Sequence, residues 1–134
     1  MDLRVQTVIA FMRDGLHQEL TVCQMAECVN LTASHFSRLF KVETGLSPFK
    51  YLKVLRMEKA KVLLESTFLN VKEIMNKVGV RDESHFVRDF KTICGATPTQ
   101  YRDNFRPMAK YDHFAISRSA NDNHNRLINK INGQ

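Results

Sequence analysis

The sequence lacks several features that would place it among membrane, secreted or metal-dependent proteins. No stretch approaches the roughly 18 consecutive apolar residues of a membrane-spanning helix. Asp2, Arg4 and Arg13 interrupt the apolar residues that a secretion signal would need. The three cysteines are an odd set without a disulfide framework, and Cys23 and Cys28 would point to different faces of one helix. We therefore expect a cytoplasmic protein with no membrane partner, no metal and no other cofactor.

Acidic residues are also fewer than basic ones. The 134 residues include 14 Asp and Glu against 20 Lys and Arg, which gives a formal net charge of +6 and a pI near 9.4. This balance suits a polyanionic partner such as nucleic acid, but many solvated protein surfaces look similar. Charge therefore permits a nucleic-acid function without identifying it.

What the sequence does contain is an internal duplication. The segment HFSRLFK at residues 35–41 recurs as HFVRDFK at residues 85–91, fifty positions later. The same register continues, without a gap, from Gly45 to Gly95 and from Tyr51 to Tyr101. Stacked repeat proteins need three or more units to bury a continuous core. Two copies therefore predict a pair of subdomains.

Each copy has the pattern of two helices joined by a sharp turn. In the first copy Thr21 is placed to cap one helix, Asn30 suits the turn, and Thr32 is placed to cap the next helix. In the second copy Asn70 is the expected cap and Gly79 the turn residue, with one more residue between the helices. This order of helix, short turn and helix is the helix-turn-helix layout.

The whole chain is predicted to be all-α, with seven helices forming two helix-turn-helix subdomains. We expect an amphipathic first helix over residues 2–13, its apolar positions including Leu3, and a short seventh helix ending near Asn104. Ser47 is the expected cap, and Pro48 the first residue, of a long connecting helix of about 27 Å. The predicted division is 1–46 for the first subdomain, 47–66 for the connecting helix, 67–106 for the second subdomain and 107–134 for a loose polar tail.

The second helix of each copy has two different faces. Its apolar side carries Phe36, Leu39 and Phe40 in the first copy and Phe86, Phe90 and Ile93 in the second. Its polar side carries Ser34, Ser37, Arg38 and Lys41 in the first copy and Ser84, Val87, Arg88 and Lys91 in the second. An α-helix fits the major groove of B-DNA, where Arg bonds guanine and Ser donates or accepts. A connecting helix of this length would hold two such helices roughly 34 Å apart, one turn of the duplex, so that one chain reads an asymmetric site as a monomer.

From Thr21 to Phe105 the chain resembles the DNA-binding domain of AraC/XylS-type transcription regulators, either a small stand-alone member or the C-terminal part of a longer one. The residues that carry the resemblance are the motif at 37–41, Gly45, Ser47-Pro48, Arg56, Ala60, Leu63-Leu64, Ile74, Val78-Gly79, Phe86, Arg88, Phe90-Lys91, Gly95, Thr97-Pro98 and Tyr101-Arg102. The resemblance implies a double-stranded promoter site and activation through contact with RNA polymerase.

The resemblance also implies the site residues. Base contacts carry over to Ser34, Ser37 and Arg38 in the first recognition helix and to Ser84, Val87 and Arg88 in the second. Phosphate contacts are expected at Thr21, Lys41 and Lys91. Arg56 is expected to tie the connecting helix to a helix-turn-helix unit rather than to read bases.

The second unit departs from the family pattern. Val80 stands where an aromatic residue is usual and Arg81 where a small hydroxyl cap is usual, so Asp82 is the expected cap. Val87 cannot hydrogen-bond to a base, and Asp89 puts negative charge near phosphates. We therefore expect the second unit to bind DNA more weakly than the first.

Two other function classes remain open at this level. One is a protein-interaction module that keeps the helix-turn-helix fold without DNA binding. The other is an enzyme, such as an alkyl-transfer repair protein with a zinc-bound cysteine. The scattered cysteines and the lack of a nucleophile and base at a readable spacing argue against the enzyme, so we predict no catalytic residues.

Overall fold

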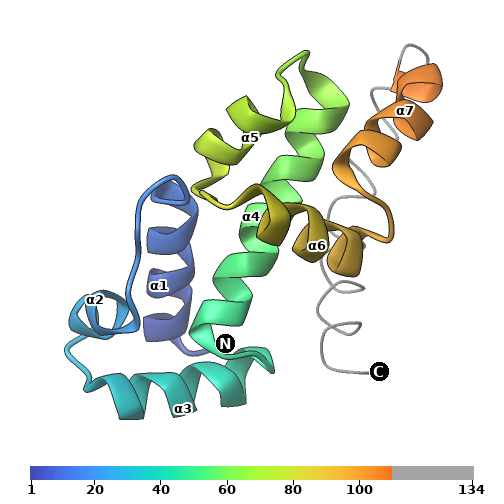
Figure 1. Cartoon of the computed structure of the whole chain (residues 1–134). Helices are drawn as coiled ribbons and strands as arrows, with labels where there is room; N and C mark the ends of the chain where they lie inside the picture. The colour runs from blue at the N-terminus through green and yellow to red at the C-terminus, as the bar shows by residue number, and fades with distance from the viewer. Residues whose placement is uncertain (110–134) are drawn as a thin grey trace.

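The computed structural model describes residues 1–109, with side chains as far as residue 105, and within this range the only regular secondary structure is α-helix (Figure 1). The helices are α1 (Leu3–Asp14), α2 (Val22–Glu27), α3 (Ala33–Thr44), α4 (Pro48–Ser66), α5 (Val71–Val78), α6 (Glu83–Cys94) and α7 (Pro98–Ala109). The predicted all-α fold with seven helices is therefore confirmed. Most of the predicted polar tail, residues 110–134, lies outside the described residues.

Side-chain caps explain where the helices begin. The residue before each of five helices accepts a hydrogen bond from the backbone N–H three positions further on: Thr21, Thr32, Ser47, Asn70 and Asp82. Such caps satisfy N–H groups that have no partner within the helix. All five residues were predicted as caps, including Asp82 in place of the hydroxyl residue usual in the family.

The turns inside the two helix-turn-helix units confirm the predicted difference in length. Asn30 and Gly79 occupy the left-handed backbone region, with φ of 57° and 80°. They are 49 positions apart, whereas the caps Thr32 and Asp82 that follow them are 50 positions apart. The extra residue in the second unit therefore lies between the left-handed residue and the cap.

The duplication is also visible in the core of each unit. In the first unit the ring centroids of Phe36 and Phe40 are 5.5 Å apart, and Tyr51 meets Phe40 edge-on at 5.3 Å. In the second unit the corresponding centroid distances are 6.0 Å for Phe86 and Phe90 and 5.7 Å for Phe90 and Tyr101, again edge-on. The four Phe rings are fully buried, and edge-on aromatic pairs stabilise a core beyond their buried area.

Helix α4 is the spine of the molecule. It packs against α3 near its start and against α5, α6 and α7 further along. Its buried residues lie on several sides of the helix: Pro48, Tyr51, Leu52, Val54, Leu55, Met57, Ala60 and Leu64. A helix that is apolar around most of its circumference is a central one. Its 19 residues span about 28 Å, close to the predicted length.

Polar contacts hold α7 against the end of α4. The Tyr101 hydroxyl donates to the Glu65 carboxylate, and burial together with this negative neighbour raises the pKa of Tyr101 well above its usual value. The Arg102 guanidinium donates to backbone carbonyls at the end of α4, including that of Leu64 at 3.2 Å from Nε. These contacts close the second unit around α4.

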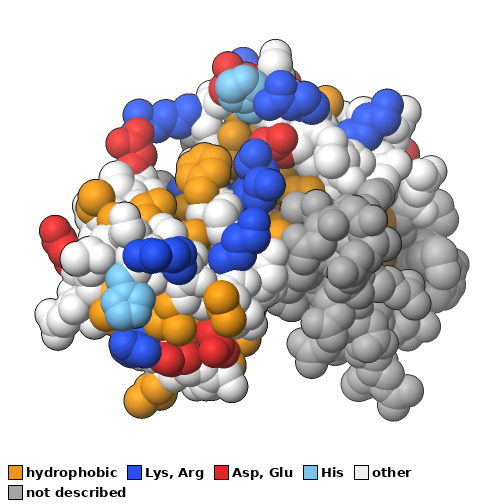
Figure 2. Space-filling model, turned by 90° about the horizontal axis from the view of Figure 1, so that it is seen from below, with side chains coloured by type: hydrophobic (Ala, Val, Ile, Leu, Met, Phe, Trp, Pro, Cys, Tyr) orange, Lys and Arg blue, Asp and Glu red, His pale blue; other side chains and the backbone are white. Residues whose placement is uncertain are grey.

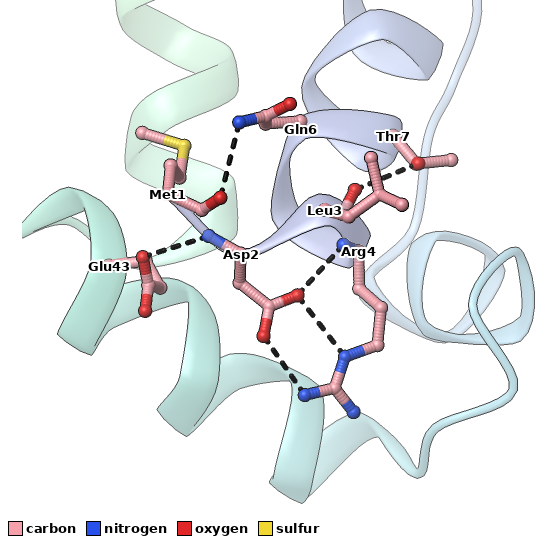
Figure 3. Close-up of polar contacts among 7 residues, drawn as sticks. All are labelled: Met1, Asp2, Leu3, Arg4, Gln6, Thr7 and Glu43. Atoms are coloured by element: carbon pink, nitrogen blue, oxygen red, sulfur yellow. Dashed lines mark hydrogen bonds and ion pairs between the residues drawn. The ribbon is translucent and has the colours of Figure 1, made fainter.

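The start of α1 is tied to α3 (Figure 3). The Asp2 backbone N–H donates to Glu43 Oε2 on α3 at 3.1 Å, and the Asp2 carboxylate caps α1 by accepting from the Arg4 N–H at 2.8 Å. The Arg4 side chain also pairs with Asp2, which lowers the pKa of that carboxyl. The first helix is thereby anchored beside the C-terminal end of α3.

Two local predictions were wrong. Leu3 was assigned to the apolar side of the first helix, but it is 74% exposed, whereas Val5, Val8 and Met12 are fully buried. Leu3 is the first residue of α1. Periodicity predicts which face of a helix is apolar, but it does not predict how much of that face the neighbouring helices cover. The seventh helix was expected to end near Asn104, but α7 continues to Ala109 and includes Pro107. The bias of the residue before proline against helix is a preference rather than a prohibition.

Candidate nucleic-acid interface

The outer side of α3 carries the predicted polar set of the first unit. Ser34, Arg38 and Lys41 are exposed and Ser37 is half-buried, while Phe36 and Phe40 on the opposite side are in the core. Arg38 Nε makes one long hydrogen bond of 3.4 Å to the Ser34 carbonyl. Within residues 1–109 the Arg38 side chain has no carboxylate partner. Its guanidinium therefore keeps donors available for an external acceptor.

The outer side of α6 carries the corresponding set of the second unit. Ser84, Arg88 and Lys91 are exposed and Val87 is half-buried. Arg88 differs from Arg38 in its surroundings, because Arg88 Nε lies 3.8 Å from Asp89 Oδ1. The other Asp89 oxygen lies 3.7 Å from Lys53 Nζ on α4. Asp89 therefore pairs with basic groups of both α4 and α6.

The three residues predicted to contact phosphates are all exposed. Lys41 and Lys91 lie in the last turns of α3 and α6. The Thr21 hydroxyl accepts from the Gln24 N–H at 3.2 Å as the cap of α2, so its own proton remains free to be donated. Each of the three side chains thus has an N–H or O–H group that can donate a hydrogen bond to a phosphate oxygen.

A groove of about 410 Å³ lies between α4 and the start of α6. Its positive and titratable residues are Lys53, Arg56, Arg81, His85 and Arg88, and its carboxylates are Asp82 and Asp89. A hydrogen bond from the His85 N–H holds the pKa of the Asp82 carboxyl below its usual value. The groove is thus mainly basic and borders the N-terminal half of α6.

Lys53 lines this groove but was not among the site residues predicted from the sequence. Its ammonium lies 5.7 Å from the centre of the Phe49 ring, which is 57% exposed. The available signal was the spacing of four residues between Phe49 and Lys53, which puts both on one face of α4. Nothing in the sequence indicated that this face meets Asp89 of α6.

Figure 2 shows the molecule from below, with α3 toward the viewer. Lys and Arg side chains form a column across the middle of this face, with hydrophobic side chains beside them and a carboxylate at the upper end. Asp and Glu side chains also occur toward the edges. The face is thus mixed in charge, with one column of basic side chains at its centre and others toward its edges.

The cysteines take no part in a site among the described residues. Cys23 and Cys28 are exposed, Cys94 is half-buried, and no disulfide joins any two of these three cysteines. In residues 1–109 no group of three or more His, Cys, Asp or Glu is placed to hold a metal ion. None of the helices in this range has the length and hydropathy needed to cross a bilayer.

Comparison with known proteins agrees with the helix-turn-helix fold. The family model described as "Helix-turn-helix domain" matches residues 25–104. The lactose operon transcription activator of Staphylococcus xylosus is 33% identical over 101 residues, which cover 75% of this chain and 36% of that protein. The chain spans about a third of the length of the curated relatives it matches first.

Solved structures show the same relationship. The C-terminal domain of AraT, a response regulator from Geobacillus stearothermophilus, has a TM-score of 0.73 and 35% identity, covering 77% of this chain and 86% of that chain. The DNA-binding domain of AdpA, a global transcriptional factor solved in complex with a target DNA, has a TM-score of 0.76 and 26% identity, covering 81% and 97%.

The fold is that of a DNA-binding helix-turn-helix protein. More specifically, the chain belongs to the AraC-type family of helix-turn-helix transcription regulators. The predicted family resemblance is confirmed. The relatives named above are transcription regulators and not enzymes, in agreement with the prediction.

Proposed function

We propose that this protein binds a specific, asymmetric double-stranded promoter site by inserting α3 and α6 into adjacent major grooves. The observation that carries the proposal is that α3 and α6 share one pattern, a buried aromatic side and an outer side that carries Ser, Arg and Lys. Both helices pack against α4. In Figure 1 the two helices lie across α4 and run in similar directions. That arrangement is what two successive grooves on one side of a duplex require.

Base recognition in this proposal falls on three residues of each recognition helix. These are Ser34, Ser37 and Arg38 on α3, and Ser84, Val87 and Arg88 on α6. Arg38 and Arg88 bond guanine bidentately, the serines donate or accept, and Val87 contacts a thymine methyl. Thr21, Lys41 and Lys91 bind phosphates, which position the helices without reading sequence.

The two half-sites contribute unequally. Arg38 makes no ion pair with a carboxylate of the described residues, whereas Arg88 Nε lies 3.8 Å from Asp89 Oδ1. The Asp89 carboxylate repels phosphates and competes for the guanidinium. The first unit therefore supplies more of the binding free energy than the second.

The wider role is that of a transcription activator in the cytoplasm, acting as a monomer on DNA and contacting RNA polymerase. One relative is named as an operon activator, which favours activation over repression. A single chain carrying two different recognition helices needs no symmetric partner to fill an asymmetric site. We assign residues 1–46 and 67–106 to the two reading units and residues 47–66 to the helix that joins them.

Selection of bound duplexes from a random pool, followed by anisotropy titration at two salt concentrations, tests this proposal. We expect a two-part site whose halves are about 10 base pairs apart, with affinity that falls as salt rises because counterions are released. Randomising the half read by α6 should cost less than randomising the half read by α3. Failure to enrich any sequence would favour a protein-interaction module instead. A larger loss of affinity on randomising the α6 half than on randomising the α3 half would refute the claim that the first unit binds more strongly.

A further inference from the structure

The loop between α1 and α2 lies at the junction of the two helix-turn-helix units. Arg56 on α4 donates to this loop twice, from Nε to the Leu16 carbonyl at 3.2 Å and from Nη2 to the Gln18 carbonyl at 2.8 Å. Burial lowers the pKa of Arg56, although an arginine remains charged at neutral pH. The sequence-based expectation that Arg56 has a structural role is consistent with these bonds.

The same loop contacts the turn that leads into α6. Gly79, at the end of α5, has φ of +80°, and a Cβ atom placed on it would overlap the carbonyl oxygen of Leu16. The same atom would lie 3.1 Å from the Cα atom of His17. The contact is one backbone against another, so side-chain rotation cannot relieve it. The first unit thus touches the second only four residues before α6 begins.

Neighbouring side chains continue this contact. Leu16 and Val80, from the two units, are partly buried against the common core. Arg81 pairs with Glu19 at 3.1 Å, but both side chains are more than three-quarters exposed. An ion pair so exposed contributes little. The bonds of Arg56 and the close approach at Gly79 therefore carry the junction.

We infer that residues 16–19, held by Arg56 and abutting Gly79, form a brace that sets the position of α6 relative to α3. This inference rests on the proposed two-groove function for its purpose, but the brace itself is a property of the free protein. Helix α4 also relates α3 to α6, since both helices pack against it. With the brace, the loop that belongs to the α1–α3 unit also bears on the α5–α6 turn. The brace therefore selects the spacing between half-sites that one molecule can bind.

Two glycine variants separate the brace from ordinary backbone strain. Gly79→Ala places a Cβ against the loop, whereas Gly95→Ala is a matched control. Gly95 also ends a helix in the left-handed region, with φ of +86°, but apart from its own chain neighbours no atom of the described residues lies within 4 Å of the position its Cβ would take. Both variants place a non-glycine residue at positive φ, which most side chains disfavour. The control lacks the contact with the first unit.

The distance between α3 and α6 can be measured without DNA. Spin labels on Val42→Cys and Thr92→Cys report it by double electron–electron resonance, since both positions are exposed and occupy equivalent places on the two helices. The background replaces the three native cysteines with Cys23→Ser, Cys28→Ser and Cys94→Ala. We expect one narrow distance for the parent and for Gly95→Ala, and a shifted or broadened distribution for Gly79→Ala. An unchanged distribution in folded Gly79→Ala would overturn the brace, whatever the protein binds.

The consequence for DNA is measured separately, on duplexes that carry both half-sites or only one. Rigid linkage raises the affinity for two sites together, so Gly79→Ala should lose about tenfold on the double site while changing the single site by less than about twofold. Gly95→Ala should keep the parent protein's ratio of double-site to single-site affinity. Equal losses on both duplexes would refute the positioning role. If Gly79→Ala does not fold, Arg56→Gln, which cannot reach both carbonyls, is judged by the same two measurements.

Discussion

Replacing Arg38 by alanine and by lysine separates base recognition from charge neutralisation on α3. Arg38 makes only one long bond of 3.4 Å, to its own helix, and has no carboxylate partner among the described residues. Its removal should therefore change folding stability little, and the effect should appear in DNA binding. A bidentate bond to guanine contributes about 1 to 3 kcal/mol, so Arg38→Ala should bind its selected site roughly 5-fold to 160-fold more weakly.

The lysine variant supplies the control. Arg38→Lys keeps the positive charge but lacks the planar fork that bonds two guanine atoms at once. If Arg38 reads a base, lysine should recover only a small part of the loss. Both variants should also bind a duplex changed at the base pair that Arg38 reads about as well as they bind the selected duplex. The assay is anisotropy titration of a series of duplexes, each with one base pair changed, at constant salt.

Two results would refute the reasoning. Full recovery by Arg38→Lys, or an equal loss on every duplex in the series, would make Arg38 a phosphate contact. A large drop in the free energy of unfolding of Arg38→Ala would show that the side chain has a structural role that its exposure conceals. Denaturant titration of the free protein measures that quantity.

Three further predictions concern the second unit. Asp89→Asn should raise affinity for DNA and steepen its salt dependence, because it frees Arg88 and removes a charge that repels phosphate; unchanged titrations at two salt concentrations would contradict this. Tyr101→Phe should lower the free energy of unfolding by about 1 to 3 kcal/mol in guanidinium titration, because Glu65 loses its hydroxyl donor; no change would show that water replaces the bond at no cost. The lowered pKa of Asp82 means that its charged form stabilises the fold above about pH 4 and that this contribution is lost on acidification. The difference in the free energy of unfolding between the parent protein and Asp82→Asn should therefore shrink as the pH falls below about 4. A constant difference from pH 7 to 2 would show that the Asp82 charge does not stabilise the fold.

The predictions that succeeded concern interactions within a few residues along the chain. Thr21 and Asp82 cap helices through the backbone three residues ahead, and Asn30 takes a left-handed turn because its own backbone allows it. The repeat separates the buried Phe side of α3 and α6 from the exposed Arg side, since helical periodicity assigns faces without reference to the rest of the fold. Helix types, starts, faces and the family could all be read in this way.

Packing between distant segments supplied what the sequence left open. Leu3 fits the apolar pattern yet is exposed, because its burial depends on how far the partner helices reach. Lys53 meets Asp89, and Gly79 meets Leu16, across separations of 36 and 63 residues along the chain. Such contacts follow from the angles at which helices cross, which no local spacing encodes. The two helix-turn-helix units can thus be read from the sequence itself, whereas the placement of α3 relative to α6 arises from backbone and side-chain contacts formed when the two units pack around α4.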